Sequence, residues 1–277
     1  MTDEAAAAVA RVAQAFDGIA DVYDQSGVSF FGPIADRLCE LVAPVPGEQV
    51  LDVGCGRGAV ALRAAGSVTP DGAVTAVDVS AAMVEHTRAA ADRAGLSNVR
   101  TAVLDPSAPE LPARSFDVLT ASLVLFFLPD PAAGLAQWLG WVRPGGRVAL
   151  TTFGAQDETW RAVDELFAPY LPAHLLDPRT RGVDTPFTSD EGVAGLVRDA
   201  GGVDVRTVRE RLAVRFTDAA QWREWTMGTG QRRFWGLVPE DRREGLFDAA
   251  AALLEGARND AGDILVHQDV RYTLCGV

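Results

Sequence analysis

The sequence predicts an α/β domain with a doubly wound, mostly parallel, Rossmann-like sheet of seven strands and a helical cap. The first observation is that short apolar runs alternate with alanine-rich stretches over residues 45–153, an order typical of parallel strands joined by helices. The second is a turn with glycines at alternate positions, Gly54, Gly56 and Gly58. Such glycines let the chain turn sharply and let a ligand lie against bare backbone at the start of a helix.

The predicted elements follow one another in the order that this fold requires. Strands are predicted over 50–53, 73–77, 98–105, 115–122, 147–152, 203–216 and 264–274. Helices are predicted over 59–66, after Ser80 as an N-cap, from 129–131 to about 142, and after the run 188–191. The sequence Arg-Pro-Gly-Gly at 143–146 is predicted as a turn.

Acidic residues lie at the ends of the first three strands. Asp52 is near the end of the first, and Asp78 and Asp105 close the second and third. Because parallel sheets bind ligands beyond the carboxyl ends of their strands, these carboxylates are expected to meet in one crevice. The charge of Asp52 would repel a pyrophosphate and attract an ammonium or sulfonium group, which points to S-adenosylmethionine. With Ala59, the glycine turn also fits a relaxed dinucleotide fingerprint, so a nicotinamide-dependent oxidoreductase stays an alternative.

In combination, five motifs over residues 45–153 resemble the core of a class I S-adenosylmethionine-dependent methyltransferase. They are Asp-Val-Gly-Cys-Gly-Arg-Gly at 52–58, the acidic strand ends Asp78 and Asp105, Ser-Phe-Asp-Val at 115–118 and Arg-Pro-Gly-Gly at 143–146. Their order and spacing make the combination far more specific than any single motif.

The resemblance implies cofactor roles for the matching positions. Asp52 and the carbonyl of Gly54 would hold the methionine ammonium, and Asp78 would bind the ribose hydroxyls. Val79 and Met83 would sandwich the adenine. Asp105 would accept a hydrogen bond from the adenine amine, and Ser122 and Leu123 would line the site near the sulfonium. The cofactor contacts expected altogether are Asp52, Gly54, Cys55, Gly56, Asp78, Val79, Met83, Leu104, Asp105, Ser122 and Leu123.

Residues 1–44 are predicted to form a helical lid. The sequence Phe-Asp-Gly-Ile-Ala-Asp-Val-Tyr-Asp at 16–24 resembles the leader of small-molecule methyltransferases of the quinone-biosynthesis type, which folds over the cofactor. Tyr23 is therefore a candidate catalytic residue, and Phe16 is a candidate substrate contact. A hydrophobic staple on an N-terminal helix explains the same pattern equally well.

Two segments outside the core, 154–187 and 217–260, are expected to form the cap and the acceptor pocket. The candidate substrate contacts here and after the fourth strand are aromatic: Phe127, Trp160, Trp222, Trp225 and Trp235. Gln231–Arg233 is a candidate anion contact. Alternatively, the tryptophans of the cap only pin it to the core, and Gln231–Arg233 lies on an exposed helix face.

The segment 123–128 is apolar where many relatives carry a polar residue. This favours an apolar or aromatic acceptor, and within that class a carbon or nitrogen atom of an indole or polyene. Where an acceptor has to lose a proton, Tyr23 and His174 are the candidates. Proximity and the exclusion of water would otherwise suffice.

Composition limits the partners. The formal net charge of −13 argues against nucleic acid. Three widely spaced cysteines and three dispersed histidines predict no metal site and a reducing, cytoplasmic setting. The N-terminus lacks the basic region of a signal peptide, and the apolar stretch 118–128 is too short to enter and cross a membrane. A homodimer is left open.

The sequence thus predicts one domain over 1–277 that transfers a methyl group from S-adenosylmethionine to a carbon, nitrogen or oxygen atom of a small metabolite. The reaction would release S-adenosylhomocysteine. The alternative is an enzyme that binds the same cofactor and catalyses a cyclisation or rearrangement without methyl transfer.

Overall fold

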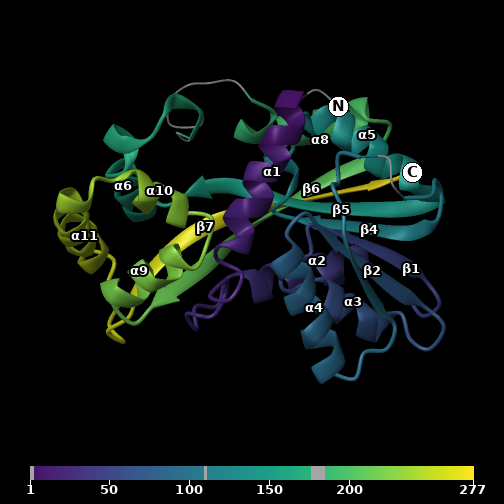
Figure 1. Ribbon diagram of the computed structural model, residues 1–277, viewed down its shortest axis with the longest axis horizontal. Coiled ribbons are helices and arrows are strands. Elements are labelled where there is room, and N and C mark those ends of the chain that lie inside the picture. The colour runs from purple at the N-terminus through teal and green to yellow at the C-terminus, as the bar shows by residue number, and fades with distance from the viewer. Residues whose placement is uncertain (1–2, 109–110, 176–184) are drawn as a thin grey trace.

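The seven strands form one sheet in the order β3-β2-β1-β4-β5-β7-β6 (Figure 1), which confirms the predicted doubly wound fold. The computed structural model describes residues 3–108, 111–175 and 185–277. Strands β1 to β5 pair in parallel, whereas β7 runs antiparallel to β5 and β6. The strands are β1 (Gln49–Val53), β2 (Ala73–Asp78), β3 (Val99–Val103), β4 (Phe116–Ser122), β5 (Val142–Gln156), β6 (Val203–Phe216) and β7 (Ile264–Gly276).

Side chains alternate between the two faces of the sheet, as the two-residue period of a strand requires. Val50 and Val118 join the apolar cluster on one face, and Leu51 and Leu119 join the cluster on the other. All four side chains are fully buried. Burial on both faces is what a parallel sheet between two layers of helices needs.

Helices cover both faces of the sheet. In Figure 1, α2, α3 and α4 lie below the sheet, and α5 and α8 lie above it. Ser80 caps α4 as predicted, because its hydroxyl accepts a hydrogen bond of 3.1 Å from the backbone N–H of Met83. The bounds are α2 (Phe31–Val42), α3 (Ala61–Ser67), α4 (Ala81–Arg93), α5 (Pro131–Trp141) and α8 (Asp190–Asp199).

Most of the remaining helices stand at the end of the sheet where β5, β6 and β7 extend beyond the other strands (Figure 1). The long helix α1 crosses in front of the sheet and packs against α4. These helices are α1 (Asp3–Asp17), α6 (Glu158–Glu165), α9 (Ala219–Met227), α10 (Arg232–Leu237) and α11 (Glu240–Glu255), with short 3-10 turns η1 (Leu125–Phe127), η2 (Ala168–Tyr170), η3 (Ala173–Leu175) and η4 (Pro186–Thr188). We call α6, α9, α10 and α11 the cap.

We predicted a turn before a strand for the Arg-Pro-Gly-Gly sequence at 143–146. In the structure these residues lie within β5, where they form an irregularity. Phe116 pairs with Val142 and Val118 pairs with Arg147, so β5 bulges between these two pairs. The C-terminus accounts for the difference, because Gly145 N–H donates to the carbonyl of Val277 at 2.7 Å. Strand pairing therefore extends into the predicted turn.

Candidate functional site

The glycine turn after β1 needs glycine for its backbone and its packing. Gly54, Gly56 and Gly58 have φ angles of +67°, +54° and +89°, a region that L-residues with a side chain rarely adopt. A Cβ at Gly54 would lie 2.3 Å from Cγ2 of Val124. The turn therefore brings its bare backbone against the segment after β4.

Asp52 lies on β1 with an exposed fraction of 1%. The Thr120 hydroxyl on β4 donates a hydrogen bond of 2.8 Å to its Oδ1. Its Oδ2 is buried and has no partner among the described residues. Burial raises the pKa of Asp52 to about 7, although the Thr120 hydroxyl and the Ala61 backbone N–H oppose the shift. An enclosed carboxylate with one unpaired oxygen fits a cationic ligand group.

Asp78 ends β2 and holds the glycine turn in place. Its Oδ2 accepts a hydrogen bond of 2.9 Å from the Gly56 N–H, and its Oδ1 accepts one of 2.9 Å from the Ser80 N–H. Burial raises the pKa of Asp78. Asp105, after β3, accepts hydrogen bonds from the N–H and hydroxyl of Ser107 at 2.8 and 2.6 Å. Asp78 and Asp105 line one hollow, whereas Asp52 lines the hollow next to it.

Most of the predicted cofactor residues line two adjoining hollows that share Tyr23, Gly54, Gly56 and Ser122. One hollow also holds Asp78, Val79, Met83, Asp105 and Leu123, and the other holds Asp52 and Cys55. Leu104 lies elsewhere, in the apolar cluster above the sheet, and its N–H donates to the carbonyl of Asp78. We call the two hollows together the cofactor cleft.

The N-terminal segment covers the cofactor cleft. Val9, Val12 and Phe16 line it from α1. Asp17 accepts hydrogen bonds from the Ser80 hydroxyl at 2.6 Å and from the Ala82 N–H at 3.1 Å. These contacts fasten the end of α1 to the start of α4.

Tyr23 follows α1 and borders every hollow of the site. Its ring stacks on Phe31 with a centroid distance of 4.8 Å. Burial raises the pKa of Tyr23, and the neighbouring carboxylates of Asp24 and Asp78 raise it further. The phenol therefore stays protonated at neutral pH, so it can donate a hydrogen bond.

A larger cavity of about 660 Å³ lies between the cofactor cleft and the cap, within the size range of small-molecule pockets. Phe16, Tyr23, Leu123 and Phe127 line both spaces. These residues form the wall through which a cofactor and an acceptor would meet. We call this cavity the acceptor chamber.

The structure brings only some of the predicted tryptophans to the acceptor chamber. Trp160 and Trp225 line it and pack edge to face at 5.7 Å. Trp222 and Trp235 do not line it and instead pack against each other at 5.9 Å. The indole N–H of Trp235 donates to the Thr226 hydroxyl at 2.9 Å. This second pair pins the cap together, which corrects the prediction of substrate contacts for Trp222 and Trp235.

Polar residues of the acceptor chamber extend well beyond the predicted Gln231–Arg233. Gln231 and Arg233 line the chamber, whereas Arg232 donates to the carbonyl of Gly18 at 3.0 Å. The sequence reading missed the polar lining residues Thr152, Gln156, Arg161, Asp164, Glu165, Thr185 and Gln268. They lie on β5, β7 and α6 and just before η4, so no local motif reveals them.

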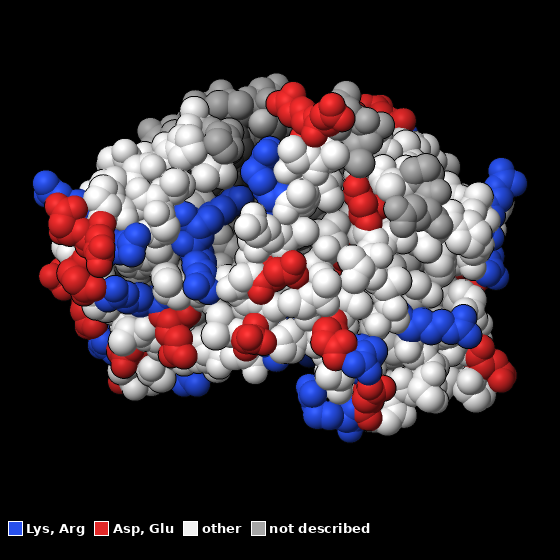
Figure 2. Space-filling view, viewed as in Figure 1, with Lys and Arg blue, Asp and Glu red and all other residues white. Residues whose placement is uncertain are grey.

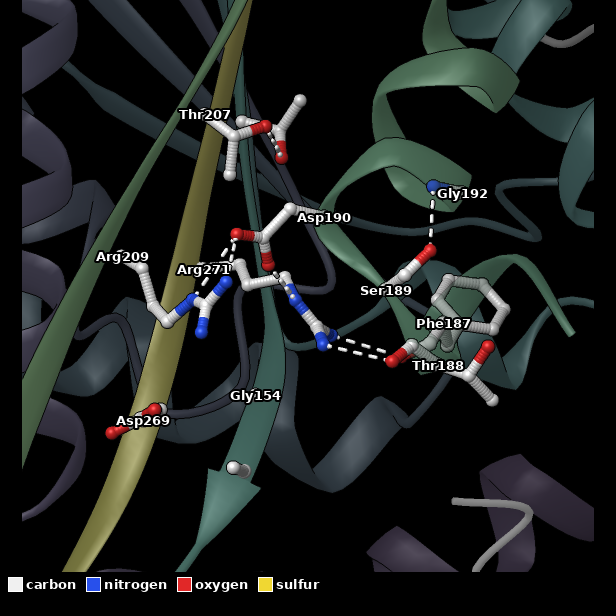
Figure 3. Close-up of polar contacts among 12 residues, drawn as sticks. Gly154, Phe187, Thr188, Ser189, Asp190, Gly192, Thr207, Arg209, Asp269 and Arg271 are labelled. Atoms are coloured by element: carbon white, nitrogen blue, oxygen red, sulfur yellow. Dashed lines mark hydrogen bonds and ion pairs between the residues drawn. The ribbon is translucent and has the colours of Figure 1, made fainter. Parts of the chain in front are cut away.

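Arg271 on β7 ties one wall of the acceptor chamber to the sheet (Figure 3). Its Nε donates a hydrogen bond of 2.6 Å to Asp190 Oδ1, and its Nη1 donates one of 2.8 Å to the carbonyl of Phe187. Asp190 also pairs with Arg209. In the run 188–191 the N-cap of α8 is Ser189 and not Thr188. The Ser189 hydroxyl accepts a hydrogen bond of 2.9 Å from the Gly192 N–H. Phe187 lines the chamber, so this network fixes the position of its wall.

Other candidates have less structural support. His174 lies in η3, and its side chain is outside the described residues. Within residues 3–108, 111–175 and 185–277, no group of His, Cys, Asp and Glu could hold a metal ion. No helix of the same residues is long and apolar enough to cross a membrane.

Known proteins resemble this chain over most of its length. A family model described as a methyltransferase domain matches residues 50–146. The nocamycin O-methyltransferase of Saccharothrix syringae is 40% identical over 239 residues, which cover 82% of this chain and 85% of that protein. The aklanonic acid methyltransferase DauC of Streptomyces sp. strain C5 is 40% identical over 167 residues, or 60% of this chain and 76% of that protein. Both are named for methyl transfer, which does not favour a cyclisation or rearrangement.

Solved structures share the fold. A methyltransferase-like protein from Bacillus halodurans has a TM-score of 0.58 at 16% identity, over 88% of this chain and 99% of that chain. Phosphoethanolamine N-methyltransferase 2 of Haemonchus contortus, in complex with S-adenosyl-L-methionine, has a TM-score of 0.57 at 16% identity, over 94% of this chain and 57% of that chain. At these identities the likeness concerns the fold alone.

Proposed function

This chain belongs to the class I S-adenosylmethionine-dependent methyltransferases, and we propose that it methylates an oxygen atom of a small aromatic metabolite. The observation that carries the proposal is the wall of Phe16, Tyr23, Leu123 and Phe127 between the cofactor cleft and the acceptor chamber. The name of the nocamycin O-methyltransferase supports oxygen as the methylated atom. An oxygen acceptor replaces the carbon or nitrogen acceptor that the apolar segment 123–128 favoured.

The cofactor would lie along the carboxyl ends of β1, β2 and β3. The unpaired Oδ2 of Asp52 would bind the ammonium group, which would offset the cost of burying that charge. Asp78 would bind the ribose hydroxyls, and Val79 and Met83 would hold the adenine. Asp105 would accept a hydrogen bond from the adenine amine. When bound, S-adenosylmethionine supplies an electrophilic methyl carbon on a sulfonium.

The residues of this chain would then position the acceptor and exclude water. Leu123 lies at the shared wall with a φ angle of +60°, held there because its N–H donates to the Thr151 hydroxyl at 2.9 Å. Phe16 and Phe127 pack edge to face at 5.4 Å and would keep solvent from the reacting atoms. Alignment of this kind lowers a barrier by about 7 kcal/mol or more.

The proton of the acceptor is the remaining requirement. The high pKa of Tyr23 makes its phenol a hydrogen-bond donor rather than a base at neutral pH. An acceptor oxygen that is already ionised, as in a carboxylate or an acidic phenol, needs no base. This is consistent with the absence of a polar side chain in the segment 123–128.

The proposal is tested by the release of S-adenosylhomocysteine from S-adenosylmethionine in the presence of acceptors. Purified protein is incubated with a panel of aromatic carboxylates, phenols, indoles and polyenes, and the products are identified by mass spectrometry. We expect S-adenosylhomocysteine with a carboxylate or phenol, and a product heavier by one methylene group. Methyl transfer confined to carbon or nitrogen acceptors would contradict the oxygen assignment.

A further inference from the structure

Unsatisfied polar atoms mark the acceptor chamber. Among the described residues, the buried side-chain atoms without a hydrogen-bond partner are Asp52 Oδ2, Thr152 Oγ1, Thr185 Oγ1, Trp225 Nε1 and Gln231 Oε1. The first lies in the cofactor cleft, and the other four belong to residues that line the chamber. Buried polar groups nearly always have partners. Their concentration here indicates a ligand that carries polar atoms of its own.

The chamber also holds cationic groups without a carboxylate partner. Arg161 on α6 and Arg233 on α10 both line it, and in the part of the chain that the structure describes neither forms an ion pair. Arg233 contacts the ring of Phe234 at 5.3 Å, and surrounding protein lowers its pKa by desolvation. Figure 2 shows basic side chains beside a hollow between α1 and the cap.

Asp164, which also lines the chamber, is held by amide groups and not by either guanidinium group. It accepts hydrogen bonds from Gln156 at 2.6 Å and from Gln231 at 3.0 Å. The arginines come from α6 and α10, which contribute no residue to the cofactor cleft. Their charges therefore face the part of the acceptor that is remote from the methyl donor.

We propose that the acceptor is an oxygen-bearing aromatic anion, held at its remote end by the guanidinium groups of Arg161 and Arg233. The inference rests on the proposed function and names its substrate class. The walls of Phe126 and Phe153, which stack at 5.6 Å, contact the aromatic body of the acceptor. The Thr152 hydroxyl and the Trp225 indole N–H serve its neutral oxygen atoms. Both groups are donors, so a ligand with oxygen acceptors satisfies them.

The test compares two molecules of equal shape that differ in charge, naphthalene-2-carboxylate and naphthalene-2-carboxamide. Their binding is measured by calorimetry in the presence of S-adenosylhomocysteine, so that no turnover occurs. We expect the carboxylate to bind about tenfold more tightly, because hydrogen bonds to charged groups are the stronger ones. The preference should shrink as the salt concentration rises.

Matched variants assign this preference to the two arginines. The double substitution of Arg161→Gln and Arg233→Gln should abolish it, whereas Arg242→Gln, at an exposed position on α11, should preserve it. Trp225→Phe should weaken both probes alike, because it removes the N–H and keeps the ring packing. Equal binding of the two probes to the wild-type protein, or no binding of the carboxylate at its solubility limit, would overturn the inference. Failure of S-adenosylhomocysteine itself to bind would instead overturn the proposed function.

Discussion

The hydroxyl of Thr120 donates a hydrogen bond of 2.8 Å to Asp52 Oδ1, while Oδ2 of the same carboxylate is enclosed without a partner. Thr120 lies beside Asp52 on the neighbouring strand, where the two residues are paired in register. The hydroxyl orients the carboxylate and leaves half of it unsatisfied. Such an arrangement costs stability in the free protein and favours a cation that enters the cleft.

The pKa of Asp52 gives this cost a pH dependence. Because the folded-state pKa of about 7 lies above the ordinary aspartate value of 3.8, the folded protein keeps a proton that the unfolded chain has lost between these values. The contribution of Asp52 to stability is thus present at low pH and is lost as pH rises toward 7. Asp52→Asn should show no such loss, which parallel denaturant titrations of the two proteins over this range would measure.

Asp52→Asn should have the opposite effect on ligand binding, where it should weaken the affinity and not protect the protein. Between about pH 5.5 and about pH 7.5 the affinity of the wild-type protein for S-adenosylmethionine should rise, because the ionised carboxylate pairs with the ammonium. At the upper pH, Asp52→Asn should bind roughly 10- to 100-fold more weakly. Calorimetric titrations at both pH values measure this. An unchanged affinity in the variant would show that Asp52 does not contact the ligand.

Gly54→Ala should damage the cofactor cleft without enlarging any side chain by more than a methyl group. The positive φ angle costs about 1–2 kcal/mol with a Cβ, and the contact of 2.3 Å with Val124 adds overpacking of about 1–3 kcal/mol. The control is Gly66→Ala in α3, where nothing lies within 4 Å of the added Cβ. It should raise the free energy of unfolding by roughly 0.5–1 kcal/mol. Chemical denaturation measures the free energy of unfolding of both variants. Equal decreases in Gly54→Ala and Gly66→Ala would contradict the predicted clash with Val124.

Arg271 and Arg209 share Asp190 and differ in burial, with exposed fractions of their side chains of 5% and 53%. Arg271→Gln leaves the carbonyl groups of Phe153, Phe187 and Thr188 without the guanidinium donor and should lower the free energy of unfolding by about 3–5 kcal/mol. Arg209→Gln removes a surface ion pair and should cost about 1 kcal/mol or less. Chemical denaturation decides between them. Comparable losses would mean that the chamber wall does not depend on Arg271.

Tyr23→Phe tests whether the phenol acts as a donor. The variant keeps the stacking on Phe31 and should weaken S-adenosylhomocysteine binding by about two- to tenfold. The loss should be the same at about pH 7 and about pH 9, because the raised pKa keeps the phenol protonated over this range. Tyr170→Phe in η2 is the control and should bind normally. A loss confined to the higher pH would identify a phenolate instead.

Local signals made the core of the fold predictable. Most parallel strands are apolar runs next to a turn, and the bounds of β6, Val203–Phe216, were predicted in full. The sequence at 143–146 was misread because its pairing partner is the C-terminal Val277, more than a hundred residues away. A local turn motif carries no information about such a partner.

The candidate site divides in the same way. The glycine turn and the acidic strand ends predict the cofactor cleft, because the residues of these motifs are themselves the ones that line it. The acceptor chamber is assembled from distant segments, so Thr152 and Arg161 could not be picked out. Trp222 and Trp225 lie in the same helix, and packing against Trp235 rather than sequence decides which of them is turned away from the chamber.

The most direct test of the account is a calorimetric titration of the purified protein with S-adenosylmethionine, S-adenosylhomocysteine and, for comparison, a nicotinamide dinucleotide. We expect both adenosyl ligands to bind at a single site and the dinucleotide to give no heat. The absence of binding by either adenosyl ligand, or binding of the dinucleotide in their place, would contradict it.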